Sequence, residues 1–126
     1  WRPLKTSGSQ RDIPLVGASL WAAQRLSEAF PDSPYAFPRY NRKDTTNSNS
    51  ASAALKKWLH QYVPLGCTMH SFRHSMRDRL RAVECPSDVI DQIGGWATEG
   101  VGQGYVEGFS VQVLNNWLTR INYLPT

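Results

Sequence analysis

A histidine and an arginine stand three positions apart in the segment His70-Ser71-Phe72-Arg73. On a helix, this spacing places both side chains on one face. Both would also lie in the first turn, where free backbone N–H groups suit an anion such as phosphate. A cation there opposes the helix dipole, and such local rules are broken most often at functional sites. The pair therefore indicates a phosphate-binding site, with a solvated polar face as the alternative.

A second feature is the window from 94 to 108, which holds six of the nine glycines and is interrupted by Trp96 and Tyr105. Glycine at this density weakens a helix by up to about 1 kcal/mol per residue. A tyrosine on such a segment is able to move. An ordinary flexible loop is the alternative interpretation.

A third feature is a pair of cations, Lys5 and Arg11, on either side of a polar, glycine-containing turn signal. Extended pieces at 2–5 and 12–15 flank this turn, so the sequence predicts a β-hairpin within residues 1–15. A lysine beside a hairpin turn is usually only solubilising. The pair indicates chemistry only in combination with the other two features.

The order of these residues along the chain resembles that of the tyrosine recombinases, and of phage integrases in particular. That order is lysine, then His-x-x-Arg, then tryptophan, then tyrosine. Trp96 follows Arg73 by 23 positions and Tyr105 follows Trp96 by nine, which match the usual intervals of that family. The resemblance runs from Lys5 to about Ile121. The segments that carry it are Lys5-Thr6, Arg11-Asp12-Ile13-Pro14-Leu15, His70-Ser71-Phe72-Arg73-His74 and Ile93-Gly94-Gly95-Trp96. Four elements in order at matching spacing are far more specific than a lone His-x-x-Arg.

The resemblance implies site-specific DNA recombination through a 3′-phosphotyrosyl bond between DNA and Tyr105. Arg73 would stabilise charge on the non-bridging phosphate oxygens, because its planar fork can pair with two of them. Trp96 would donate its indole N–H to the phosphate, or serve as a core residue instead. His70 would bind phosphate or help deprotonate the tyrosine. Lys5 would protonate the leaving 5′-oxygen as a general acid.

The family also uses a first catalytic arginine on a helix upstream of the hairpin, and no residue of this chain takes that role. We therefore expect residues 1–126 to be the C-terminal part of a catalytic domain, truncated on its N-terminal side and inactive alone. The resemblance implies no cofactor and no metal. It implies double-stranded DNA as the partner, a homotetramer on that DNA, and DNA-bending accessory proteins. The last helix packs against a neighbouring protomer or on its own in relatives, and the sequence does not choose between these.

Two other functions fit the same residues. A type IB topoisomerase uses similar residues, but it reseals the same strand and acts as a monomer. A non-catalytic DNA-binding or interaction module would be left by decay of such an enzyme. The intact series of Lys5, His70, Arg73, Trp96 and Tyr105 argues against decay.

Further cations are candidates for contacts with DNA phosphates, which add affinity without sequence specificity. The net charge of +4 is compatible with a nucleic-acid partner. The candidates are Arg11, Arg39, Arg42, Lys43, Lys56, Lys57 and Arg77. Arg77 and Arg81 are expected to touch the DNA backbone or to pair with Asp78 or Glu84 rather than to act in the chemistry, and His74 is expected to be structural.

Two cysteines, Cys67 and Cys85, fit no metal-ligand spacing. We expect both to be reduced thiols in a protein of the bacterial cytoplasm, associated with the nucleoid. No apolar run approaches the roughly 20 residues needed to span a bilayer, and no signal peptide is visible. No membrane partner is therefore expected.

The elements that must position these residues are mostly helices, because apolar residues recur at helical spacing. The expected helices span 17–30, 51–63, 69–83, 86–94 and 110–122. Residues 31–50 contain three prolines and a polar run, and are expected to form the most mobile loop. We expect one mainly α domain with a small β-hairpin, an α+β fold of the tyrosine recombinase (DNA breaking-rejoining enzyme) catalytic type.

Each expected helix has an apolar face and a start or stop signal. A Ser or Asn cap before residue 51, Thr68 and Pro86 are the expected starts, and Gly94-Gly95 is an expected stop. The expected core residues, in chain order, are Leu20, Ala23, Leu26, Phe30, Leu55, Leu59, Tyr62 or Val63, Met69, Phe72, Met76, Leu80, Val83, Val89, Ile90, Ile93, Val111, Leu114, Leu118 and Ile121.

Overall fold

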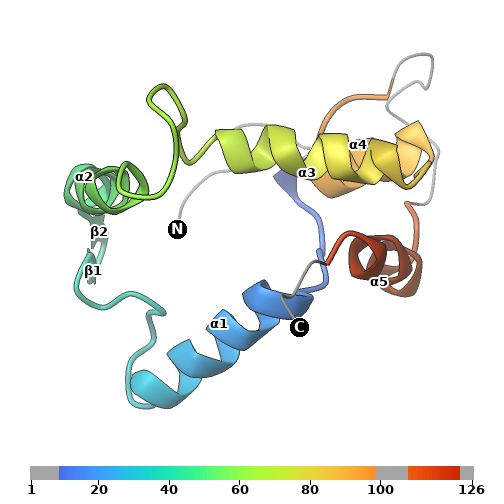
Figure 1. Ribbon diagram of the computed structural model, residues 1–126. Helices are drawn as coiled ribbons and strands as arrows, with labels where there is room; N and C mark the ends of the chain where they lie inside the picture. Colours follow the sequence, from blue (N-terminus) through green and yellow to red (C-terminus); the bar gives the residue numbers. More distant parts are fainter. Residues whose placement is uncertain (1–8, 99–107, 123–126) are drawn as a thin grey trace.

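Three helices enclose the hydrophobic core: α3 (Ser71–Ala82), α4 (Ser87–Gly94) and α5 (Val111–Arg120). The computed structural model describes residues 9–98 and 108–122, and α3 and α4 lie side by side in it, with α5 close by (Figure 1). The buried residues of this core are Leu80, Cys85, Val89, Ile90, Ile93, Leu114, Leu118 and Ile121. The expected apolar faces of α4 and α5 are therefore confirmed, except that Val111 is exposed.

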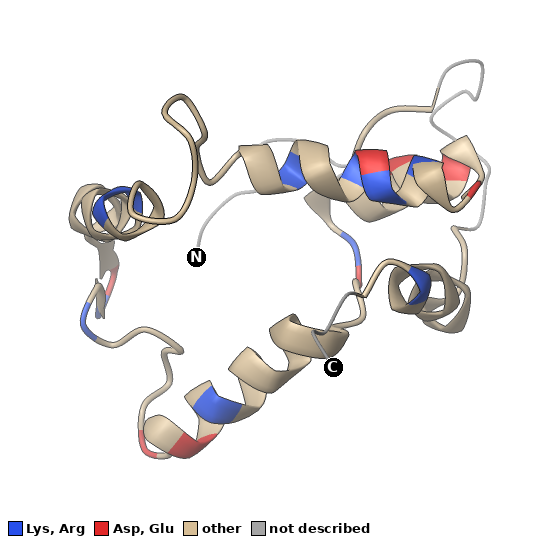
Figure 2. Cartoon of the chain, in the orientation of Figure 1, with Lys and Arg blue, Asp and Glu red and all other residues tan. Residues whose placement is uncertain are grey.

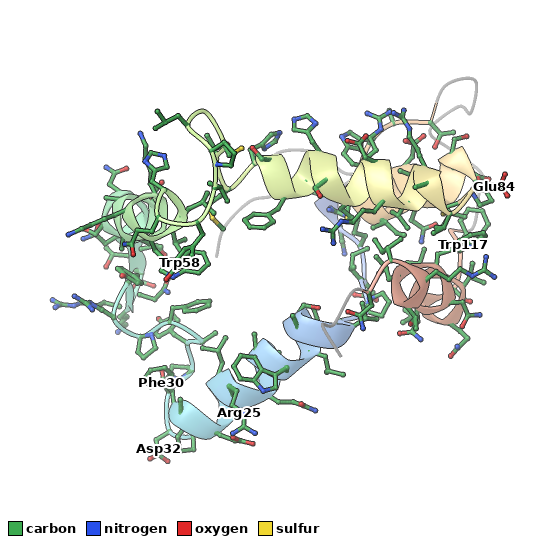
Figure 3. All side chains as sticks on the ribbon, in the orientation of Figure 1. Arg25, Phe30, Asp32, Trp58, Glu84 and Trp117 are labelled. Carbon is green, nitrogen blue, oxygen red and sulfur yellow. The ribbon has the colours of Figure 1, made fainter. Side chains whose placement is uncertain are left out.

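A tight turn reverses the chain between α3 and α4. The N–H of Cys85 donates to the carbonyl of Leu80 at 3.0 Å, and Glu84 takes a positive φ of 60°. This bond satisfies a carbonyl that the end of a helix leaves free. Pro86 then caps α4 in an extended conformation. The turn lies at the far end of α3, where Figure 3 labels Glu84.

Helix α3 begins two residues later than expected, at Ser71, with His70 as its N-cap residue. Thr68 does not cap it with its side chain. Instead, the backbone N–H of Thr68 donates to the Ser71 hydroxyl at 3.0 Å. Only the C-terminal half of the expected apolar stripe is covered, because Phe72 and Met69 are exposed while Leu80 is fully buried.

Helix α5 lies within its expected span of 110–122 and is capped by Ser110. The Ser110 hydroxyl accepts a hydrogen bond from the backbone N–H of Val113 at 3.3 Å, which satisfies one free donor of the first turn. Trp117 packs beside the core and Figure 3 shows it between α5 and the α3–α4 pair. Its ring also lies 4.1 Å from the guanidinium carbon of Arg120.

Helix α1 (Gly17–Ala29) was expected over 17–30, and that span is confirmed. It contains no buried residue, so the expected core positions Leu20, Ala23, Leu26 and Phe30 are wrong as core positions. Helical periodicity reports that a face is apolar, but burial also needs a neighbouring element to cover it. Figure 1 shows α1 leading away from the core, and its far end is marked by Phe30 and Asp32 in Figure 3.

A small hairpin interrupts the segment 31–50 that was expected to be a loop. Strands β1 (Asn41–Arg42) and β2 (Thr45–Thr46) pair antiparallel, with Asn41 opposite Thr46. Asp44 in the turn takes a φ of 61°, a left-handed conformation that aspartate tolerates better than most residues. The two strands form the whole described sheet, so the expectation of a mainly helical chain with a small antiparallel sheet is confirmed.

The hairpin expected within residues 1–15 lies partly in residues 1–8, which are outside the described residues. In the described part, residues 10–16 form no strand. This segment runs against the core instead, because Ile13 and Val16 pack on the core cluster.

Helix α2 (Ser48–Leu59) was expected at 51–63 and lies three to four residues earlier. The Asn47 side chain caps it by accepting a hydrogen bond from the N–H of Ser50 at 3.1 Å. Leu59 is buried as expected, whereas Leu55 and Tyr62 are exposed. Within the ranges 9–98 and 108–122, no helix combines the length and the apolar character needed to cross a bilayer.

Candidate active site

Arg73 and Trp96, which are 23 positions apart in the chain, meet beside the core. The guanidinium carbon of Arg73 lies 4.2 Å from the centroid of the Trp96 ring. This distance is well inside the range of about 6 Å over which a cation is attracted to an aromatic face. Two of the predicted site residues are thus brought together by the α3–α4 pair.

Two glycines at the end of α4 place Trp96 there. Gly95 closes the helix at a φ of 68°, and the N–H of Trp96 then donates to the carbonyl of Asp91 at 2.9 Å. A Cβ atom at Gly94 would collide with the indole ring. Any larger residue at position 94 would push the indole away, so this stop signal also fixes the tryptophan. Trp96 is half-buried and packs on the core as well as on Arg73.

Arg77 lies one helical turn after Arg73 and contacts the same ring. Its guanidinium carbon is 5.0 Å from the centroid of Trp96. Its Nε atom is buried and has no hydrogen-bond partner among the described residues. Neither arginine forms an ion pair with a carboxylate in the part of the chain that the structure describes. One indole therefore holds two cations whose charge is not balanced by a neighbouring described acid.

His70 and His74 lie on the same end of α3. Their rings meet edge-on, with centroids 5.0 Å apart and an interplanar angle of 73°. Both side chains are exposed, and His70 is the last residue before the helix. Among the described residues no hydrogen bond to the His70 ring is seen, and His70 lies within one turn of Arg73.

Arg11 is anchored to the protein backbone rather than pointing freely into solvent. Its Nε donates to the carbonyl of Ile93 at 3.0 Å, and one terminal nitrogen donates to the carbonyl of Ser9 at 3.2 Å. These bonds tie the segment before α1 to the end of α4. Arg11 thus has a structural role that the sequence did not indicate, and part of its donor capacity is already used.

A pocket of about 530 Å³ opens between Arg11, the end of α4 and the start of α5. Trp96, whose ring contacts the two arginines, forms part of its wall. The lining residues are Gln10, Arg11, Asp12, Asp91, Gln92, Gly95, Trp96, Gly108, Phe109, Ser110 and Val111.

Gln92 joins α4 to the residues that precede α5, a contact that the sequence did not reveal. Its amide nitrogen donates to the carbonyl of Phe109 at 2.9 Å, and its amide oxygen accepts from the N–H of Phe109 at 2.6 Å. This two-bond pairing, called the Gln92 clasp below, holds the chain four positions after Tyr105. A polar residue on an amphipathic helix carries no sequence signal for such a role.

The predicted nucleophile Tyr105 and the predicted general acid Lys5 lie outside the described residues. Their expected roles stay predictions. Of the five predicted catalytic residues, the structure describes His70, Arg73 and Trp96, and it brings the last two into contact.

The remaining candidate DNA-contact residues lie apart from this site, on the β1–β2 hairpin and on α2 (Figure 2). Arg39, Arg42 and their neighbours line a second pocket of about 500 Å³. Lys56 and Lys57 occupy the last turn of α2, where cations complement the helix dipole. The exposed cations of this group are Arg39, Arg42, Lys43, Lys56 and Lys57.

The cysteines are both free thiols, as expected. Burial, reinforced by the nearby carboxylate of Asp88, raises the pKa of the Cys85 thiol to about 11, although Arg120 acts in the opposite direction. Cys85 is therefore a protonated core residue at neutral pH. Among the described residues, no group of three or more His, Cys, Asp or Glu side chains could hold a metal ion.

No protein-family model matches the chain. No curated protein matches it, and no solved structure does either.

Proposed function

We propose that this chain is the catalytic part of a tyrosine recombinase of the phage or prophage integrase kind, with that family's catalytic-domain fold. The observation that carries the proposal is the contact between Arg73 and Trp96 at 4.2 Å. The recombinase resemblance assigns these two residues to one phosphate, and the contact supports that assignment because it joins residues 23 positions apart in the chain.

In the proposed reaction, the phenolic oxygen of Tyr105 attacks the scissile phosphorus and the bond from phosphorus to the 5′-oxygen breaks. Lys5 gives a proton to the leaving 5′-oxygen. A 3′-phosphotyrosyl bond and a free 5′-hydroxyl result. The 5′-hydroxyl of a second strand then attacks the phosphotyrosyl bond and releases Tyr105, so the bond energy is retained.

The described residues supply charge stabilisation to this reaction. Arg73 donates its fork to two non-bridging oxygens, and the indole N–H of Trp96 donates to one. His70, at the start of α3, binds phosphate or assists deprotonation of the tyrosine. Stabilisation of this kind is usually the largest catalytic contribution, about 3–4 kcal/mol for a good donor.

The proposed partner is double-stranded DNA, bound by a homotetramer with DNA-bending accessory proteins in a bacterial cytoplasm. The cations of the β1–β2 hairpin and α2 would contact the DNA backbone and add affinity without sequence specificity. The proposed mechanism also needs a first catalytic arginine, and none of residues 1–126 has that role.

The experiment uses the longest natural polypeptide that contains these residues and a nicked suicide DNA substrate, in which the leaving strand diffuses away. We expect a covalent protein–DNA complex that the Tyr105→Phe variant does not form. A complex of undiminished yield in that variant, or none in the unaltered protein, would contradict the proposal. Exchange of strands between two DNA sites is the expected product, whereas relaxation of supercoils without exchange would indicate a topoisomerase.

A further inference from the structure

The hydrogen-bonding capacity of Arg77 is not satisfied within the described fold. Its Nε atom is buried and has no hydrogen-bond partner among the described residues. Buried donors in native proteins are nearly always paired, and an unpaired one needs an explanation such as a missing ligand. Arg77 is also the second cation against Trp96, at 5.0 Å from the ring centroid.

The chemistry of the missing ligand follows from its neighbours. Arg73 stands one turn before Arg77 on α3 and contacts the same indole. Neither guanidinium is paired with a described carboxylate, although both contact one indole ring. An anion with several acceptor oxygens would balance both positive charges and accept hydrogen bonds from both forks.

We propose that Arg77 is a second phosphate-binding guanidinium, which binds the same phosphodiester as Arg73 with Trp96 holding both forks. This inference rests on the proposed function for the identity of the phosphodiester, although the anion site itself does not. Because the Nε atom is buried, binding requires the Arg77 side chain to turn its fork toward the incoming phosphate. Arg77 then acts as a catalytic residue rather than as one of many contacts along the DNA.

The first test is independent of activity. Inorganic phosphate is titrated into the isotopically labelled chain, and the Nε–H signals of its arginines are followed by nuclear magnetic resonance. The Arg73 and Arg77 signals are expected to move together with one dissociation constant. Arg81, an exposed arginine one turn later on α3, is the internal control. A stationary Arg77 signal while that of Arg73 moves would overturn the inference.

The second test measures the rate of covalent complex formation at saturating suicide DNA. Arg77→Gln is expected to slow it about 100-fold, the effect of losing one oxyanion donor, and Arg77→Lys is expected to rescue little because lysine lacks the fork. The control Arg25→Gln, at an arginine of α1 that is paired with Glu28, is expected to leave the rate unchanged. An Arg77→Gln rate equal to that of the unaltered protein would overturn the inference.

A methylphosphonate at the scissile position separates phosphate binding from a structural role, because a neutral methyl group replaces one anionic oxygen. The fold reduction in the rate of covalent complex formation caused by Arg77→Gln is expected to be smaller on this substrate. An equal defect on both substrates would mean that Arg77 only positions Trp96. If the unaltered protein forms no covalent complex at all, the proposed function fails, and the phosphate titration alone then decides whether the anion site exists.

Discussion

Trp96 combines packing with hydrogen-bond capacity, and a pair of substitutions separates the two. Trp96→Phe retains an aromatic ring for Arg73 and the core but removes the indole N–H, so covalent complex formation is expected to fall about 100-fold, as for a lost oxyanion donor. Trp96→His retains a donor and is expected to keep more activity despite poorer packing. Single-turnover rates and thermal unfolding of both variants check this. If Trp96→Phe forms the covalent complex faster than Trp96→His, Trp96 acts through packing alone.

Cys85 makes the free energy of unfolding depend on pH in the alkaline range. Its thiol has a pKa of about 11 in the folded chain against 9.0 for an ordinary thiol, so the folded state holds this proton more tightly. The resulting stabilisation is complete below pH 9 and is lost as the pH rises toward 11. The free energy of unfolding is expected to fall over this window, and Cys85→Ala is expected to lose that part of the slope. Denaturant titrations at several pH values measure the free energy of unfolding. An equal dependence on pH in the unaltered chain and in Cys85→Ala would contradict the raised pKa of this thiol.

The same burial predicts slower reaction of Cys85 with thiol reagents than of Cys67, which is only half-buried. Thiolates are the reactive form, and burial both hides the sulfur and keeps it protonated. Mass spectrometry of partly labelled chains checks the order, and faster labelling of Cys85 would show that its surroundings open readily.

At the scale of elements, the Gln92 clasp connects α4 to the start of α5. Gln92→Ala removes both hydrogen bonds and is expected to cost about 1–2 kcal/mol of stability. Since Tyr105 precedes Phe109 by four positions, covalent complex formation is expected to slow while DNA affinity stays the same. Gln92→Glu retains the acceptor for the Phe109 N–H but loses the donor, so an intermediate effect is expected. Weaker DNA binding with an unchanged cleavage rate would contradict this role.

Much of the helical framework could be predicted from apolar periodicity and capping residues. Asn47 and Ser110 cap α2 and α5, and Gly95 closes α4. The motif spacing also predicted that Arg73 and Trp96 belong together. Periodicity could not show that α1 lacks a covering partner, which leaves its apolar face exposed.

Other features had no sequence signal because they depend on three-dimensional proximity. The Arg11 bond to Ile93 joins residues 82 positions apart, and nothing in either neighbourhood indicates it. The β1–β2 hairpin was hidden by surrounding proline and polar residues, since its turn depends on one aspartate in a left-handed conformation.

At the scale of the molecule, α1, the hairpin and α2 extend from the α3–α5 core (Figure 1), and a group of exposed cations lies on α2 and on or just before the hairpin. If these cations bind DNA phosphates, replacing Lys56 and Lys57 by glutamine is expected to weaken binding of all sequences alike. The dependence of log affinity on log salt is expected to flatten by about one unit for each phosphate that the protein no longer neutralises.

Arg25→Gln on α1 is the matched control for this measurement. Arg25 is paired with Glu28 at 3.0 Å, so removing it is expected to change neither the affinity nor its salt dependence. An α1 variant with half the effect of the double α2 variant, that is, an equal effect per charge removed, would mean that only net charge matters.

The covalent bond between Tyr105 and DNA is central to the proposed mechanism, and its most direct test is to locate that bond. Trypsin cleaves after Arg81 and Arg120, and the peptide of residues 82–120 contains Tyr105 as its single tyrosine. The protein is trapped on suicide DNA, digested with trypsin and nuclease, and analysed by tandem mass spectrometry. We expect a 3′-linked nucleotide phosphate on Tyr105 in this peptide. A nucleotide on any other residue, or on none, would contradict the mechanism.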